Sequence, residues 1–524
     1  MDTNIFKKMV GNKSIEVHTE QAYFEALQKS VKNGDKMLVL GMLLERSARI
    51  FPHNVALIYN DREITYQELY YRACVMTEKI KAAGVKPRDR VLLFFENSLE
   101  FYIGYFGIVQ AGAVIAPLNT FLHETELAHI INDAQPTCVV AASNHSELFK
   151  KNAPNVPVLT EQDMDTTSPV VDASFTCYEL EYTEMAALLY TSGTTGMPKG
   201  VMLSSKNIIT NVMQGLARLQ LRESERLFGV LPLFHSFSQN TCVWAAFFAG
   251  CSVIVVPKID RRSILAALQH NPTIMLGVPA FYGLLCMFKT APFSRVKYFV
   301  SGGDALPDKI RAAFALVYRR KLCNGYGLTE ATPMVSVDLE DVTEPTSNIG
   351  RPFFGIDVAI VAEDGTHMPH GSIGHLIIKG DNVMMGYYNA PDATAAALHD
   401  GWLYTGDLAY IDDNGKIVIT GRIKDLIIHK GFNIYPQEIE NIILSHANVI
   451  RAGVVGKPSE DAGEVPVAFV QLRASQEGIE KELKALCLQH LASYKVPKEF
   501  FVTTENLPTT ATGKVDKKVL RKKL

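Results

Sequence analysis

Residues 189–203 read LYTSGTTGMPKGVML, in which two apolar runs enclose a loop of hydroxyl-bearing residues, glycines and a lysine. Small residues let backbone N–H groups approach an oxyanion closely, hydroxyls add donors, and Lys199 adds a positive charge. The loop is not a Walker A motif, because no Gly-Lys-Ser/Thr opens a helix; instead residues 201–203 predict a second strand. We therefore expect a phosphate-binding turn between two strands. Its residues are Thr191, Ser192, Gly193, Thr194, Thr195, Gly196 and Lys199.

On both sides of this loop, short apolar runs alternate with helical patterns. The runs before it include VALIYN, RVLLFF and TCVVAAS, and those after it are FGVLPLF, CSVIVVPK, TIMLGVP and KYFVSGG. Strands that alternate with helices are typical of α/β folds with largely parallel sheets. The sequence therefore predicts an α/β fold with two sheet layers.

The pattern changes in the last third of the chain. From about Arg351, shorter strands and glycine turns predict a β-rich subdomain with a hairpin turn at Asn414-Gly415. Beyond Gly421, two helical and two strand-like segments predict a small α+β domain. Because 524 residues exceed one compact core, at least two folding units are expected. We expect an N-terminal domain over 1–420, a hinge over 421–425 and a mobile C-terminal lid domain over 426–524.

Composition excludes several classes of partner and compartment. The formal net charge is −3 and charged residues make up 20% of the chain, so no global field favours nucleic acid. Eight scattered cysteines form no C-x-x-C pair, which disfavours a zinc site or a disulfide framework. The N-terminal residues lack the apolar core of a signal peptide. A reducing, cytoplasmic location is expected.

The most apolar stretch, FYIGYFGIVQAGAVIAPL at residues 101–118, is nearly long enough to span a bilayer. Gln110, three glycines and Pro117 interrupt it, and the polar residues of FENSLE precede it as a helix start. We therefore predict a buried helix that leads into a strand, and no transmembrane segment.

The Y-T-S-G-T-T-G-x-P-K-G string resembles the phosphate-binding signature of the adenylate-forming superfamily, which contains acyl-CoA synthetases, peptide-synthetase adenylation domains and luciferases. Further segments resemble the family's motifs in the family's order. CNGYGLTEATP (323–333) is similar to the adenine and magnesium motif, YTGDLAYID (404–412) to the ribose motif, and GRIKDLIIHKGFNIYPQEIE (421–440) to the hinge motif. TTATGKVDKKVL near the end resembles the motif that holds the family's catalytic lysine. The resemblance covers the chain from about residue 40.

The resemblance implies an ATP and AMP site with Mg²⁺ as cofactor. Glu330, a hard oxygen ligand, is the expected metal ligand. Tyr326 is expected to stack on adenine, and Asp407 and Arg422 are suited to the ribose hydroxyls as acceptor and donor. Lys514 is expected to stabilise negative charge during attack on the α-phosphate. The other residues implied at the nucleotide are Gly303, Asp304, Ala305, Asn324, Gly325, Gly327 and Thr329.

The family's small domain rotates between two half-reactions, and Lys424 matches its hinge position. In the second state Lys430, Gly431 and Phe432 are expected to line the tunnel for the CoA thiol arm, with glycine leaving room for the arm to pass. CoA is thus the expected second substrate. An acyl carrier protein as acceptor, a homodimer and peripheral contact with a membrane remain open.

The segment LPLFHSFSQN, residues 231–240, favours a fatty acid as the acid that is activated. Peptide synthetases place an aspartate where this chain has His235, so an amino-acid substrate is disfavoured. The F-H-S-F-x-Q string resembles medium- and long-chain fatty acid:CoA ligases more than aryl ligases, although Ser238 stands where those relatives usually have glycine. The expected acyl pocket comprises His235, Phe237, Gln239, Val278, Phe281 and Gly302, and Cys242, Trp244 and Tyr282 fit either its wall or the core.

The sequence therefore predicts an AMP-forming fatty acid:CoA ligase with Lys514, Thr191, Lys199 and His235 as catalytic residues. Four alternatives remain: an acyl-acyl carrier protein synthetase, an aryl or other carboxylic acid:CoA ligase, an adenylate-oxygenating enzyme, and a nucleotide-binding relative without turnover. The complete set of expected site residues argues against the last of these.

Overall fold

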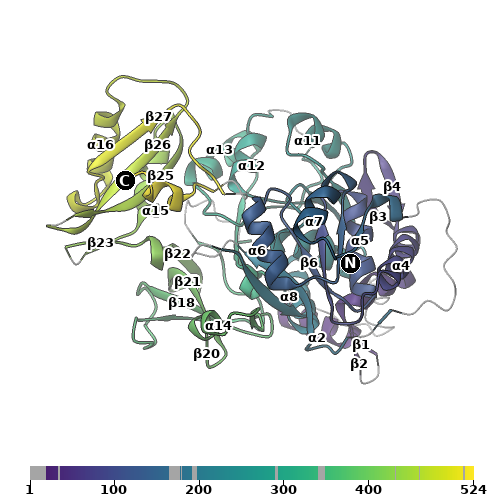
Figure 1. Cartoon of the computed structure of the whole chain (residues 1–524). Coiled ribbons are helices and arrows are strands. Elements are labelled where there is room, and N and C mark those ends of the chain that lie inside the picture. The colour runs from purple at the N-terminus through teal and green to yellow at the C-terminus, as the bar shows by residue number, and fades with distance from the viewer. Residues whose placement is uncertain are drawn as a thin grey trace.

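The computed structural model describes residues 19–33, 36–164, 177–178, 180–191, 197–288, 293–339, 348–430, 432–459, 461–510 and 514–524. A large domain is followed by a small C-terminal domain that lies to one side of it (Figure 1). The predicted α/β class and the two-part organisation are confirmed.

The first sheet of the large domain has seven strands in the order β19-β10-β9-β6-β5-β7-β8. The pairs from β9 to β8 are parallel, and β10 pairs antiparallel with β9 and β19. The quoted loop therefore joins two neighbouring antiparallel strands, as predicted. The strands are β5 (Arg90–Phe94), β6 (Val114–Pro117), β7 (Cys138–Ala141), β8 (Val158–Leu159), β9 (Met185–Thr191), β10 (Lys199–Ser204) and β19 (Gly386–Tyr387).

The second sheet has eight strands in the order β16-β15-β14-β13-β11-β12-β3-β4. Its six central strands are parallel, and β16 and β4 close the two edges in antiparallel fashion. The strands are β3 (Val55–Tyr59), β4 (Arg62–Thr65), β11 (Arg226–Gly229), β12 (Ser252–Val255), β13 (Ile274–Gly277), β14 (Tyr298–Ser301), β15 (Cys323–Gly327) and β16 (Met334–Val337).

Period-two alternation divides each sheet between two cores. Val91 and Leu93 of β5 join a central core that also receives Leu227 of β11, whereas Leu92 and Phe94 face a separate outer core. The helices that supply the central core are α2 (Glu20–Ser30), α3 (Leu43–Ile50), α4 (Tyr66–Ala82), α5 (Leu99–Gln110), α8 (Ser205–Leu219), π-helix η4 (Gln239–Ala245) and α10 (Ala246–Ala249). Outer faces are covered by α6 (Glu124–Ala134), α7 (Ser146–Asn152), α11 (Arg261–Leu268), α12 (Pro279–Leu285) and α13 (Asp308–Tyr318).

The apolar stretch at residues 101–118 folds as predicted, into α5 followed by β6. Ser98 caps α5 by accepting from the backbone N–H of Phe101 at 3.2 Å. The helix is buried along almost all of its length, and the ring of Tyr102 stacks on Phe247 at 5.7 Å between centroids. In the described part of the chain, no helix combines the length and the apolarity needed to cross a membrane.

The β-rich subdomain is an antiparallel sheet in the order β17-β18-β21-β20, with β22 added beside β21. Asp412 fixes the predicted hairpin turn, since its Oδ1 accepts from the N–H groups of Asn414 and Lys416, and Gly415 has a φ of +72°. The strands are β17 (Asp357–Val361), β18 (Gly374–Lys379), β20 (Leu398–His399), β21 (Trp402–Ile411) and β22 (Ile417–Arg422).

The small domain has its own sheet, in the order β24-β23-β26-β25 with β27 beside β26, and its own hydrophobic core. The chain enters it from β22 through the short helix η6 (Ile423–Asp425). Its elements are β23 (Ile427–His429), β24 (Phe432–Ile434), α15 (Pro436–Ser445), β25 (Val449–Ser459), β26 (Gly463–Leu472), α16 (Ile479–His490), β27 (Glu499–Thr503) and α17 (Lys517–Arg521).

Candidate active site

Gly303, Asp304 and Ala305 follow the carboxyl end of β14, and Asn324 to Gly327 form the carboxyl half of β15, with Thr329 directly after it. In parallel α/β sheets, ligands bind in the crevice beyond these ends. A Cβ placed on Gly302 would lie 3.2 Å from the ring of Phe237, and Gly303 has a φ of +76°. Glycine is therefore favoured at Gly303 by conformation and at Gly302 by close packing.

Tyr326, Asp407 and Arg422 form one polar network. The hydroxyl of Tyr326 donates to Oδ2 of Asp407 at 2.6 Å, and Nε of Arg422 lies 3.1 Å from Oδ1 of the same carboxylate. Asp407 is buried, and it lies opposite Arg422 in the β21–β22 pair. Burial raises the pKa of Tyr326 well above its ordinary value, with the Asp407 charge acting in the same direction. Asp407 thus links β15 to the β-rich subdomain, a contact that the sequence did not predict.

Of the residues expected at the phosphates, Thr191 and Lys199 are described, and Lys199 is connected to Glu330 through Tyr387. Thr191 and Lys199 are paired across β9 and β10, while Ser192, Gly193, Thr194, Thr195 and Gly196 lie outside the described residues. The Lys199 ammonium lies 5.5 Å from the centroid of the Tyr387 ring. Tyr387 in turn donates its hydroxyl to Oε1 of Glu330 at 2.8 Å. Tyr387 therefore connects the phosphate loop to the expected metal ligand.

Thr329 and Glu330 lie in a 3₁₀ turn after β15, beside Asn324, Gly325 and Gly327 of that strand. Oγ1 of Thr329 is 2.9 Å from Oγ of Ser236, a residue that sequence reasoning did not select. Among the described residues, no group of three or more His, Cys, Asp or Glu side chains forms a metal cluster. A single carboxylate nevertheless fits Mg²⁺ held mainly by nucleotide phosphates, because Mg²⁺ needs only one or two carboxylates in such sites.

The small domain contributes Lys514 to this site. Its Nζ lies 3.9 Å from Oδ1 of Asp304, in the loop that holds Gly303 and Ala305. Burial lowers the pKa of the Lys514 ammonium, and the Asp304 carboxylate opposes that shift. Arg422 and Asp407 are also close enough to influence it. The structure thus brings together Lys514, Asp304 and the Asp407–Arg422 pair, which come from three separate segments.

His235 lies close enough to this lysine for the lysine charge to affect its pKa. Burial, and then the charge of Lys514, lower its pKa to about 4. Its Nδ1 accepts from the backbone N–H of Phe237 at 3.2 Å, where His235 caps the short helix α9 (Ser236–Ser238). The proton of the neutral ring is therefore on Nε2, which is left as the donor.

The expected acyl residues lie near the same end of the sheet, although Phe281 is buried in the same hydrophobic core as Tyr282. Val278 Cγ1 lies 3.7 Å from the position of a Cβ on Gly303, and Phe281 packs on Gly277. Gln239 is fully buried, and its Nε2 donates to the carbonyl of Phe234, while its Oε1 has no partner among the described residues. Ser238, at the position where the similar ligases usually have glycine, donates its hydroxyl to the carbonyl of Leu231.

Two aromatic residues that also fitted a pocket wall belong to the core. Trp244 is fully buried and donates its Nε1–H to the hydroxyl of Tyr105 at 2.7 Å. Tyr282 is likewise buried and donates to the carbonyls of Met275 and Val300. Cys242 is buried in the same central core as Trp244.

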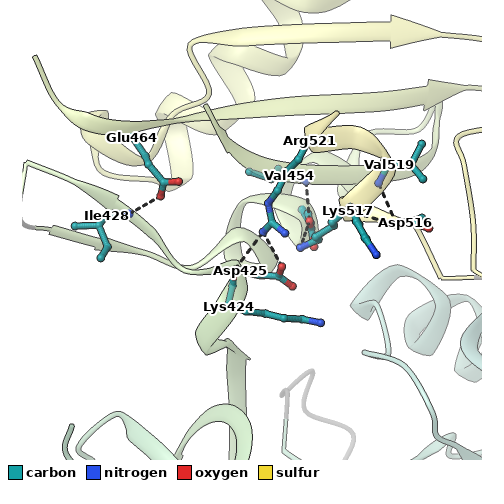
Figure 2. Close-up of polar contacts among 11 residues, drawn as sticks. Lys424, Asp425, Ile428, Val454, Glu464, Asp516, Lys517, Val519 and Arg521 are labelled. Carbon is teal, nitrogen blue, oxygen red and sulfur yellow. Dashed lines mark hydrogen bonds and ion pairs between the residues drawn. The ribbon is translucent and has the colours of Figure 1, made fainter. Parts of the chain in front are cut away.

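The expected hinge segment, residues 421–425, contacts α17 (Lys517–Arg521). Figure 2 shows Arg521 of α17 pointing at the hinge, where its Nη2 donates to Oδ1 of Asp425 at 2.7 Å and to the carbonyl of Lys424 at 3.3 Å. Lys517 of the same helix pairs with Glu440 of α15 at 2.7 Å. α17 thereby fixes the Lys514 loop to both the hinge and the body of the small domain.

The residues expected at the CoA tunnel lie elsewhere. Lys430 and Phe432 flank the turn between β23 and β24, and Gly431 lies outside the described residues. Phe432 is 57% exposed. In Figure 1, β23 lies at the lower left edge of the small domain, on the far side of that domain from α12 and α13. In this arrangement Lys514, and not the tunnel segment, faces the nucleotide site.

A cluster of polar residues at the carboxyl ends of parallel strands, approached by a lysine from a second domain, is typical of a two-domain nucleotide-dependent enzyme. Residues 44–388 match the family model described as AMP-binding enzyme, and residues 438–514 match the AMP-binding enzyme C-terminal domain. The chain belongs to the AMP-binding enzyme family.

Similar proteins share almost the whole length of the chain. The feruloyl-CoA synthase of an Amycolatopsis species is 34% identical, over 92% of this chain and 99% of that protein. A long-chain-fatty-acid–CoA ligase of Bacillus subtilis is 32% identical, over 91% and 93%. ATP-bound MatB from Rhodopseudomonas palustris superposes with a TM-score of 0.85 at 30% identity, covering 92% of this chain and 98% of that one. The protein is an acid–thiol ligase of the acyl-CoA synthetase class.

Proposed function

We propose that the protein is an ATP-dependent fatty acyl-CoA synthetase for medium- or long-chain acids. The observation that supports it most directly is the 3.9 Å approach of Lys514 to Asp304 beside the Asp407 network. The F-H-S-F-x-Q segment and the similarity to long-chain-fatty-acid–CoA ligases support a fatty acid as substrate.

In the first half-reaction, an oxygen of the fatty-acid carboxylate attacks the α-phosphorus of ATP. The bond between the α-phosphorus and the bridging oxygen to the β-phosphate breaks, and pyrophosphate leaves. Lys514 stabilises the negative charge that develops on the transferred group, and Asp407 and Arg422 hold the ribose. Neutral His235 donates from Nε2 to the carboxylate that is being activated.

The phosphate loop, with Thr191 and Lys199 at its ends, holds the β- and γ-phosphates. Glu330 would hold Mg²⁺, which when bound neutralises charge on the phosphate oxygens. Tyr387 orients Glu330 through its hydroxyl. These residues bind and position ATP without undergoing chemical change themselves.

In the second half-reaction, the CoA thiolate attacks the acyl carbonyl, a thioester forms, and AMP leaves. We propose that the small domain rotates about Lys424 for this step and presents Lys430, Gly431 and Phe432 as the thiol tunnel.

The scattered cysteines support a reducing, cytoplasmic location for the enzyme.

A second candidate is an aryl-acid:CoA ligase, because the feruloyl-CoA synthase is 34% identical over nearly its whole length. Pyrophosphate and AMP formation should be measured with fatty acids of graded length and an aryl acid, using CoA and acyl carrier protein as separate acceptors. We expect a maximum at one chain length with CoA. Turnover with the aryl acid alone, or with carrier protein alone, contradicts the proposal.

The role of Lys514 is tested by separating the half-reactions. Lys514→Ala should lower pyrophosphate release by about 10²-fold to 10³-fold, the range for losing one transition-state electrostatic group. Formation of acyl-CoA from supplied acyl-AMP should remain. Lys518→Ala, an exposed lysine of the same tail, is the matched control. Equal loss in both half-reactions contradicts this role.

A further inference from the structure

A second lysine forms a contact between the two domains. Lys514 belongs to the small domain and contacts the large one, whereas Lys309 belongs to the large domain and contacts the small one. Lys309 lies in the first turn of α13 in the large domain, directly after the loop that holds Gly303, Asp304 and Ala305. Its Nζ donates to the carbonyl of His446 at 2.9 Å and lies 3.4 Å from that of Val449. Both acceptors belong to the small domain, beyond the hinge at Lys424.

The nearer acceptor, His446, lies at the end of a helix, and Val449 begins β25. His446 is the C-cap of α15, a ten-residue helix, and the last carbonyls of a helix lack partners within it and carry partial negative charge. A cation at this end is therefore favourable electrostatically as well as through its hydrogen bonds. Lys309 caps a small-domain helix from the large domain.

The turn after α15 is otherwise fixed within the small domain. Arg473 donates to the carbonyl of Ala447 at 3.3 Å, and Asn448 donates to the carbonyl of Ala474. His446 itself faces Glu482, at 3.4 Å. These contacts attach the turn to the rest of the small domain. A contact to the turn therefore restrains the position of the whole domain.

Lys309 and Asp304 belong to one short segment of the large domain, and each contacts the small domain, Asp304 through Lys514. Rotation about Lys424 moves residues 446–449 and Lys514 together relative to that segment. Both contacts are therefore made in the arrangement that presents Lys514 to the nucleotide and separate when the small domain turns.

We propose that Lys309 is a positioning residue that docks the small domain for adenylation, and that its release accompanies the turn to thioester formation. This inference rests on the proposed function, in which one domain serves both half-reactions. Lys309 touches no reacting atom. It acts by raising the fraction of molecules in which Lys514 is in place.

The test compares Lys309→Met, Lys309→Arg and wild type in the separated half-reactions. Loss of a charge-assisted hydrogen bond shifts a two-state equilibrium by about 10-fold. Lys309→Met should lower the kcat of pyrophosphate release by about that factor with little change in KM for the fatty acid, and should leave thioester formation from supplied acyl-AMP unchanged or faster. Lys309→Arg should restore most of the loss.

Controls separate docking from folding and from the proposed function. Lys150→Met removes an exposed intrahelical contact to Glu147 and should leave both half-reactions unchanged. Hydrogen exchange of segments 304–309 and 446–449, measured on ATP-bound protein, should quicken in Lys309→Met whether or not any acid is turned over. Equal loss in both half-reactions, no rescue by arginine, or unchanged exchange would overturn the inference, whereas an inactive wild type would count against the proposed function alone.

Discussion

The two sides of the proposed nucleotide site are built differently. On the large-domain side, Asp407 is buried and bonded at 2.6 Å to Tyr326 and 3.1 Å to Arg422. On the small-domain side, Lys514 approaches Asp304 at 3.9 Å with its side chain 34% exposed. The first side is fixed before any ligand binds, whereas the second depends on where the small domain stands.

This difference predicts two kinds of variant. Changes on the fixed side should affect both half-reactions, because the AMP moiety is present in each. Changes on the movable side should affect mainly adenylation, the half-reaction that needs Lys514 at the nucleotide. The size of each effect should follow the number of buried partners that the change leaves unpaired.

The largest effect in this series is expected for Asp407→Ala. It removes the proposed ribose acceptor and leaves the Tyr326 hydroxyl without its partner, so kcat/KM should fall about 10²-fold or more in both half-reactions. Steady-state kinetics with ATP and with supplied acyl-AMP measure the two losses. Asp412→Asn, in the turn of the same hairpin, is the control. A loss confined to adenylation would contradict a fixed site.

Glu330→Gln should have a smaller and more selective effect. The amide still accepts from Tyr387 but loses the charge that suits Mg²⁺. We expect the Mg²⁺ concentration for half-maximal pyrophosphate release to rise about 10-fold, equivalent to 1.4 kcal/mol. Thioester formation from acyl-AMP, which has no triphosphate, should be unchanged. An unaltered Mg²⁺ dependence would remove Glu330 from the metal site.

The contrast also explains what could be predicted from the sequence. The helix and strand within residues 101–118, and the strand pair around the phosphate loop, follow from local periodicity and turn residues. Tyr326 to Asp407 spans 81 residues and Tyr387 to Glu330 spans 57, and neither pairing has a local pattern. Trp244 fits a pocket wall or a core equally well, because aromatic residues at helical spacing suit both.

Arg521→Met tests the attachment of the movable side. It removes the contacts to Asp425 and the Lys424 carbonyl but leaves Lys517 and the buried Leu520 to hold α17. Since Arg521 is exposed, we expect a loss of only about 2-fold to 5-fold in pyrophosphate release. Lys522→Met, in the same exposed tail, is the control. A loss as large as that of Asp407→Ala would mean that the small domain is as rigid as the fixed side.

The smallest expected change is a shift in the pKa of His235, which depends on how close Lys514 of the small domain lies to it. His235 has a pKa of about 4, lowered first by burial and second by Lys514, so the ring is neutral above about pH 4. Because the unfolded pKa is about 6.5, the unfolded chain binds more protons between these values, and the free energy of unfolding should fall as pH is lowered through that window. His235→Gln should remove this contribution, and the same variant assigns the imidazole signal in an NMR titration.

In Lys514→Ala the pKa of His235 should rise, because the lysine charge that lowers it is gone while burial remains. An unchanged pKa would mean that Lys514 does not stand beside His235 in solution, and that the movable side rests mainly in another arrangement.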